Sequence, residues 1–288
     1  MIYITGDLHG IKDAGKFLKS YFQQVVNKKE NTLIVLGDSG FSWPNQTNMV
    51  LKFFDDIGLK CKIVSILGNN DNYDDIYARK QFDFAGGKAV CIDGNEPEKS
   101  KIMYLMNGYV YNFEGRTFAV LGGADSYDAP FRVEAQRNKF FAHPRTEHKS
   151  WWKEELPSVA DFERLKSLLK NNKVDFMLSH DITSDVVKNC FPWSVDDNKI
   201  PNIFNKKRTA KTKTTRDMLD AIDSVIDTKL WLFGHHHKNY LIQNKLCVFD
   251  YFVDVNNLKN IMVVTPEGEN LSRRVFKSIN QNKEEFIK

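Results

Sequence analysis

The sequence predicts an α/β fold with two sheets packed face to face and helices on the outside. Short apolar segments alternate with helical patterns along the chain, which is typical of strands covered by helices. A second run rich in strand patterns, with hairpin turn residues at 112–115, interrupts this alternation and has a counterpart near the end of the chain. Two sheets accommodate both runs better than one.

The strands of the first run are short, apolar and followed by glycine or polar residues, as expected of buried strands. They are expected at Ile2–Thr5, Thr32–Leu36, Lys62–Leu67, Val174–Leu178 and Lys229–Phe233. Helical patterns lie between them, at about 13–27, 46–57, 73–82, 159–171 and 215–227. The strands of the second run are expected at 101–105, 108–113 and 117–121, and those of its counterpart at 246–249 and 260–265.

No repeat or sharp linker divides the chain, so we expect a single domain over residues 1–276. Residues 184–214 form its least regular part, an insertion with the basic run Lys206, Lys207, Arg208, Lys211 and Lys213. Such a run can contact nucleic-acid phosphates or simply remain solvated. Residues 277–288 are a polar C-terminal tail, expected to be frayed or a surface helix.

Composition places the chain among ordinary globular proteins, with 42% hydrophobic and 27% charged residues. No apolar run is long enough to span a bilayer, and the N-terminus lacks the pattern of a secretory signal. The four cysteines are far apart and form no CxxC pair, which favours reduced thiols. We therefore expect a cytoplasmic protein without a membrane partner. The net charge of +4 neither requires nor excludes nucleic acid.

Five polar segments directly follow the strands of the first run. They are TGDLHG (5–10), LGDSG (36–40), LGNND (67–71), LSHD (178–181) and FGHHH (233–237). Ligands of open α/β sheets bind beyond the carboxyl ends of strands, so these segments can converge on one crevice. Asp7 and His9 are two residues apart, and so are His235 and His237. In an extended chain such residues point the same way, so one strand end can offer two ligands.

The candidate metal ligands are Asp7, His9, Asp38, Asn69, His180, His235 and His237. Mixed imidazole and carboxylate ligands suit Mn, Fe or Zn better than Mg or Ca. Seven ligands are too many for one tetrahedral ion, but they suit two ions about 3.5–4 Å apart that share a carboxylate. The alternative is a set of unrelated turn residues.

These segments, in this order, resemble the calcineurin-like metallophosphoesterase family, whose pattern reads DxH, GDxx, GNH with an acidic residue, a lone His and GHxH. The resemblance covers about Thr5 to His237 and implies a four-layer α/β/β/α sandwich of two mixed sheets flanked by helices. The segment GGADSYDAPFR (122–132) looks like one seen in bacterial and phage members.

The resemblance also implies the roles of the ligands. Asp7, His9 and His237 would bind the first of two divalent ions, Mn being the first candidate. Asn69, His180 and His235 would bind the second, and Asp38 would bridge the two. Hydroxide bound to this dinuclear centre would attack a phosphate ester.

One position departs from the family pattern. Asn70 stands where the family has a histidine that contacts phosphate and helps to protonate the leaving oxygen. Asparagine can donate a hydrogen bond but cannot transfer a proton at pH 7, so Asn70 is expected to hold a non-bridging oxygen of the phosphate. General acid catalysis is worth roughly 10²–10⁴-fold, so we expect a slower enzyme, another acid or a good leaving group. His236 is a candidate acid or a solvated residue, and Arg132 is a candidate phosphate ligand or part of a structural polar cluster.

Residues next to the candidate ligands suggest supporting roles and limit the classes of substrate that fit the sequence. Asp181 is a candidate to orient His180, and Phe41 and Trp43 are expected at the rim of the cleft. The second segment continues Ser39-Gly40-Phe41 rather than with the Asp-Arg-Gly of protein phosphatases, which weakens a protein substrate.

Three functional alternatives remain open at this point. Phosphatase and phosphodiesterase activity fit the motifs equally well. A nuclease would draw on the basic run alone. A catalytically weakened binding protein that kept the fold would explain Asn70, but it would have no need of seven ligands.

Overall fold

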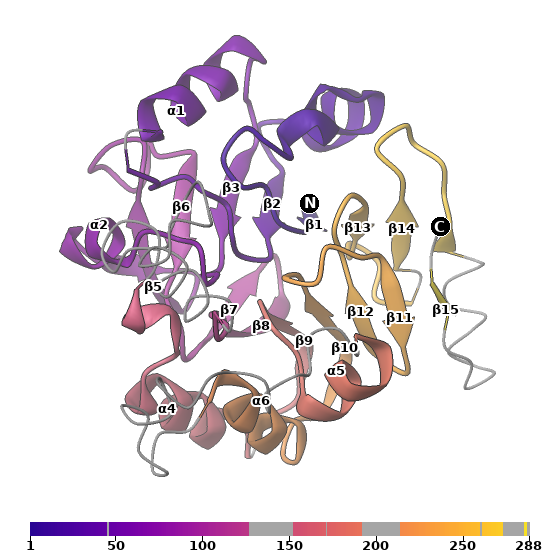
Figure 1. Ribbon diagram of the computed structural model, residues 1–288. Helices are drawn as coiled ribbons and strands as arrows, with labels where there is room; N and C mark the ends of the chain where they lie inside the picture. The colour runs from indigo at the N-terminus through magenta and orange to yellow at the C-terminus, as the bar shows by residue number, and fades with distance from the viewer. Residues whose placement is uncertain are drawn as a thin grey trace, which may run out of the picture.

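Figure 1 shows the computed structural model of the chain, in which two sheets lie between two layers of helices. The structure describes residues 1–44, 46–126, 152–170, 172–191, 214–259, 261–272 and 285–286. Within these residues, the predicted α/β sandwich of two mixed sheets flanked by helices is confirmed.

The first sheet contains the N-terminal strands. Its described strands are β1 (Ile2–Thr5), β2 (Thr32–Val35), β3 (Lys62–Ser65), β4 (Phe82–Phe84), β5 (Gly87–Cys91), β6 (Ile102–Leu105), β13 (Phe252–Asp254) and β14 (Met262–Val264). They follow the order β14-β13-β1-β2-β3-β6-β5-β4. Neighbours from β1 to β6 in this order are parallel, and the pairs at both edges are antiparallel.

The second sheet contains β7 (Tyr109–Phe113), β8 (Arg116–Leu121), β9 (Val174–Ser179), β10 (Thr228–Phe233), β11 (Tyr240–Ile242), β12 (Lys245–Cys247) and β15 (Glu285–Phe286). Their order is β15-β11-β12-β10-β9-β8-β7, with a parallel centre from β8 to β12. Parallel neighbours align their carboxyl ends, so the loops after β1, β2 and β3 share one edge, as do those after β9 and β10.

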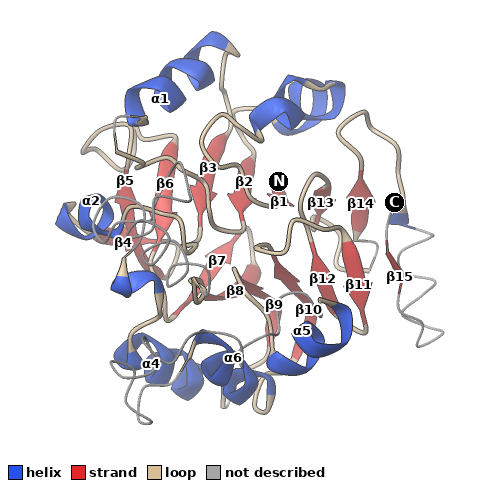
Figure 2. Cartoon of the chain, in the orientation of Figure 1, coloured by secondary structure: helices blue, strands red, loops and turns tan. Residues whose placement is uncertain are grey.

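Helices cover the outer face of each sheet, as Figure 2 shows. The first sheet carries α1 (Thr47–Asp56), α2 (Tyr73–Ala78) and the short helices η1 (Ala14–Leu18) and η2 (Phe22–Val26). The second carries α4 (Val159–Leu169), α5 (Ser184–Cys190) and α6 (Thr215–Asp223), and a helical turn, η3 (Lys153–Glu155), precedes α4. Local sequence starts two of these helices: Ser158 caps α4, and Thr214 with Asp217 forms a capping box at α6.

Strand alternation sorts the buried side chains between the layers. Ile2 and Ile4 of β1 belong to the core between the sheets, whereas Tyr3 packs under the helices of the first sheet. In the centre, the ring of Phe118 on β8 stacks on that of Phe176 on β9, with centroids 5.0 Å apart. This apolar layer fixes the distance between the two sheets, and thereby between the loops at their edges.

The structure departs from the sequence predictions at several elements. The single helix expected at 13–27 is wrong, because Lys19 is extended and the Tyr21 N–H donates to Pro266 O, which separates η1 from η2. The helix expected at 73–82 ends at Ala78 and is followed by the β4–β5 hairpin.

Other departures lie in the second half of the chain. Strands β11 and β13 were not expected, and the first residues of the segment 184–214 form α5. In the tail, Glu285–Phe286 pair with β11 instead of forming a helix or fraying. Among the described residues no helix is both long and apolar enough to cross a membrane. The domain limit near residue 276 stays a prediction.

Candidate metal centre

The five polar segments meet beside the carboxyl ends of the central strands of both sheets. Three follow the adjacent strands β1, β2 and β3, and two follow the adjacent strands β9 and β10. The convergence expected from the carboxyl ends of parallel strands is confirmed by contacts between the segments. The His235 N–H donates to Asp7 Oδ1 at 3.1 Å, and His180 Nε2 lies 3.0 Å from Asn69 Oδ1.

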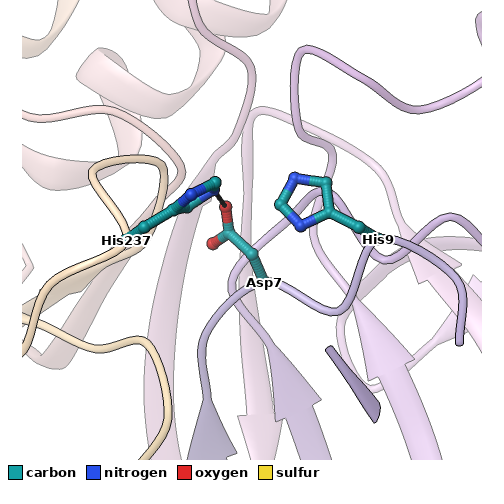
Figure 3. Close-up of side chains that lie close together, drawn as sticks. All are labelled: Asp7, His9 and His237. Atoms are coloured by element: carbon teal, nitrogen blue, oxygen red, sulfur yellow. Dashed lines mark ion pairs between the residues drawn. The ribbon is translucent and has the colours of Figure 1, made fainter. Parts of the chain in front are cut away.

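One group of candidate ligands consists of Asp7, His9 and His237, and Figure 3 shows the Asp7 carboxylate between the two imidazoles. One ligand atom from each residue lies within 4.8 Å of the others. Asp7 is fully buried, whereas the His237 side chain is 47% exposed, so this group opens to solvent on one side. His237 Nε2 is 3.2 Å from Asp7 Oδ2.

A second group consists of Asp7, Asp38 and His180, all of them buried. Each oxygen of Asp38 faces a different histidine: Oδ1 lies 3.4 Å from His180 Nε2, and Oδ2 lies 3.4 Å from His9 Nε2. Asp38 therefore faces one histidine of each group, which is the arrangement expected of a bridging carboxylate. The ring of His235 packs against that of His180, with centroids 5.0 Å apart.

Two histidines are oriented through their second ring nitrogen. His9 Nδ1 contacts Asp13 Oδ2 at 2.8 Å, and His180 Nδ1 donates to Leu36 O at 2.7 Å. Such partners turn the other nitrogen, Nε2, toward the centre. The expectation that Asp181 orients His180 is wrong, because its carboxylate contacts His236 Nε2 and accepts from Arg216 Nε instead.

The backbone is left-handed at four of the seven candidate ligands. The φ angles are 46° at His9, 48° at Asp38, 64° at His235 and 50° at His237. A tight turn, and not the alternation of an extended strand, therefore brings His9 to the same side as Asp7. Close approach of the loops also requires glycine: a Cβ at Gly68 would lie 2.2 Å from Asp38 Oδ1.

Opposite charges dominate the electrostatics of the centre. Burial raises the pKa of Asp7 and of Asp38, but the His180 charge and hydrogen bonds from histidines outweigh it, so both pKa values lie below their usual range. Burial lowers the pKa of His9 and His180, but the carboxylates outweigh it and raise these pKa values to about 9 and about 10. For His235 burial prevails and lowers the pKa to about 3, which leaves a neutral imidazole.

These residues fit divalent ions. Asp7 Oδ2 is buried and accepts no hydrogen bond of normal geometry from a described residue, although His237 Nε2 lies at ion-pair distance. Carboxylate, amide oxygen and imidazole converge there, a donor set that suits Mn, Fe or Zn. Ligation by the seven residues stays a prediction.

The other expected site residues are placed differently. Asn70 lies at the candidate ligands, where its N–H and its Nδ2 both donate to the Asp38 carboxylate, and its role in holding a phosphate oxygen stays a prediction. His236 is buried, with a side chain 1% exposed that contacts Asp181 and stacks on Phe191, so it is not solvated. This placement argues against an acid role for His236. Arg132 and the basic run lie outside the described residues.

The two aromatic residues expected at the rim also differ from each other. Phe41 is fully buried in the core under the helices of the first sheet, so its placement at the rim is wrong. Trp43 is half-buried beside His9, and its indole N–H donates to Asn70 O.

In a comparison with protein-family models, the calcineurin-like phosphoesterase model matches residues 1–239. The chain belongs to the calcineurin-like phosphoesterase family. The matched region contains all five polar segments and both candidate ligand groups. Membership implies metal-dependent hydrolysis of phosphoester bonds and confirms the family resemblance of the sequence. No curated protein matches the sequence. A bacterial or phage-type origin of this phosphoesterase stays a prediction.

Proposed function

We propose that this phosphoesterase hydrolyses phosphate esters with two divalent ions, Mn being the first candidate. Asp7, His9 and His237 would hold one ion, and Asn69, His180 and His235 the other. The observation that carries the proposal is the position of Asp38, whose two oxygens face His9 and His180 separately. A pair of bound ions would ionise a water for attack on phosphorus and neutralise charge on the phosphoryl group.

The residues of the chain would prepare the centre rather than take part in proton transfer. Asp13 and the Leu36 carbonyl fix the rings of His9 and His180. Asn70 holds both oxygens of Asp38 and offers no acidic proton. We therefore propose esters with leaving groups that depart without protonation as the best substrates, monoesters and diesters alike. The location we propose is the cytoplasm, from sequence features alone.

The test is hydrolysis of nitrophenyl phosphate and of bis-nitrophenyl phosphate with added Mn²⁺. Nitrophenolate leaves without an acid, so the absence of the family histidine does not mask activity. We expect activity in the wild-type chain and its loss in Asp38→Asn, whereas the exposed carboxylate variant Asp83→Asn keeps it. Equal activity in Asp38→Asn would contradict the proposal. Bound Mn²⁺ without hydrolysis of either ester would favour a binding protein.

A further inference from the structure

A buried lysine lies beside the first group of candidate ligands. Lys16 of η1 is 5% exposed, and its Nζ donates to three backbone carbonyls: Gly6 O at 3.3 Å, Asp7 O at 3.1 Å and Phe249 O at 2.5 Å. A buried ammonium group is costly unless hydrogen bonds compensate for lost hydration, and here all three donors are used. The Lys16 side chain thus holds the backbone carbonyl of Asp7 in place through a hydrogen bond.

The same lysine also reaches His237 through an aromatic ring. Its Nζ lies 5.6 Å from the centroid of the Phe249 ring, and this ring stacks on the His237 imidazole at 4.9 Å and 19°. Phe249 follows β12 of the second sheet, whereas Asp7 follows β1 of the first. Lys16 therefore connects the two sheets at the point where Asp7 and His237 meet.

Asn69, a proposed ligand of the second ion, is held in place by the hydroxyl group of Ser126. Asn69 Nδ2 donates to Ser126 Oγ at 2.9 Å, and the Ser126 N–H donates to the buried carboxylate of Glu155 at 2.7 Å. Because the amide nitrogen is turned to Ser126, Asn69 Oδ1 faces His180 Nε2. A reversed amide would present N–H₂, which cannot ligate a cation. Ser126 thus selects the orientation in which Asn69 can be a ligand.

We propose that Lys16 and Ser126 are positioning residues, each for a different one of the two ion positions. This inference rests on the proposed dinuclear function. Lys16 acts on the ion held by Asp7, His9 and His237, and Ser126 acts on the ion held by Asn69, His180 and His235. Loss of an outer partner of a metal ligand reduces metal affinity by roughly 10–100-fold. Substitution of Lys16 or of Ser126 should therefore reduce the affinity for one of the two ions by that factor.

The experiment is Mn²⁺ titration of the full chain in two single-site backgrounds. His237→Gln retains the second position, and His235→Gln retains the first. We expect Lys16→Met to weaken binding in the His235→Gln background alone, and Ser126→Ala in the His237→Gln background alone. Ser126→Thr, which keeps the hydroxyl group, should restore the affinity. Lys12→Met, a matched control at an exposed lysine just before η1, should leave the affinity unchanged in both backgrounds.

Different failures have different meanings. A wild-type chain that takes up fewer than two Mn²⁺ ions overturns the dinuclear function. Two ions with unchanged affinity in both variants, or equal weakening in both backgrounds, overturn the positioning roles alone. Urea unfolding without metal identifies a variant that does not fold. In that case Phe249→Leu, which removes the ring shared by Lys16 and His237, replaces Lys16→Met, with the same expected selectivity.

Discussion

Loading metal into the metal-free protein at pH 7.5 should release about two protons from His9 and His180. Both imidazoles are surrounded by Asp7 and Asp38, which raise their pKa values to about 9 and about 10 against a usual 6.5. At pH 7.5 a group with a pKa of 9 is about 97% protonated, and one with a pKa of 10 almost completely. Both must lose that proton to become ligands.

The same shifts set the pH dependence. The carboxylates have lowered pKa values and His235 is neutral, so none of them contributes to the number of protons released when metal binds. Deprotonation of the two imidazoles alone should therefore raise the apparent affinity for the ion pair by about two orders of magnitude per pH unit up to about pH 9. In the metal-free chain, the stability that His9 and His180 contribute is complete below pH 6.5. It is lost as the pH rises through about 9 and 10.

The assay is titration calorimetry with Mn²⁺ in buffers of different ionisation enthalpy, whose slope counts released protons. Ionisation of a bound water adds about one proton to the count, so the comparison with a variant is decisive. His9→Gln should release one proton fewer than the wild type. The same number from both would refute the reasoning that His9 is charged before metal binds.

Three further outcomes follow from the geometry. Asn70→His should accelerate hydrolysis of an alkyl phosphate by roughly 10-fold or more while nitrophenyl phosphate changes little, because only the alkoxide needs an acid; parallel changes in both would contradict this. Gly68→Ala should abolish Mn²⁺ uptake, since its Cβ would displace Asp38, whereas Gly15→Ala, with nothing within 4 Å, should keep it. Phe118→Ala should reduce the free energy of urea unfolding by about 3–5 kcal/mol, because the ring is fully buried between the sheets; a loss below about 1 kcal/mol would contradict that packing.

The parallel strands could be predicted because each is a continuous apolar run ended by a polar turn. The strands at 82–84 and 240–242 could not, because each is only three residues long, which is too short for an alternating pattern to be recognised in the sequence. The helix expected at 13–27 failed for a different reason. Its pattern is helical, but a tertiary hydrogen bond from Tyr21 to Pro266 interrupts it.

In the site, the side chains that converge were predictable, and those that support them were not. Spacing and residue type identify His9 and Asp38 without knowledge of the fold. The partners of the ligands carry weaker signals: Asp13 lies four residues after His9, but Lys16 looks like an ordinary exposed helical lysine. Ser126 depends on a contact 57 residues away in sequence. The i, i+2 argument assumed an extended backbone that His9, His235 and His237 do not have. Asp7 and His9 still share a group of candidate ligands, whereas His235 and His237 do not.

The distance in sequence between contacting ligands has a consequence for biosynthesis. Asn69 meets His180 across 111 residues, and Asp7 meets His235 across 228. A growing chain holds no complete set of ligands until both sheets have been made and have packed together. Metal bound at the proposed centre could therefore not guide the early steps of folding, and its binding would report that the last long-range contacts have formed.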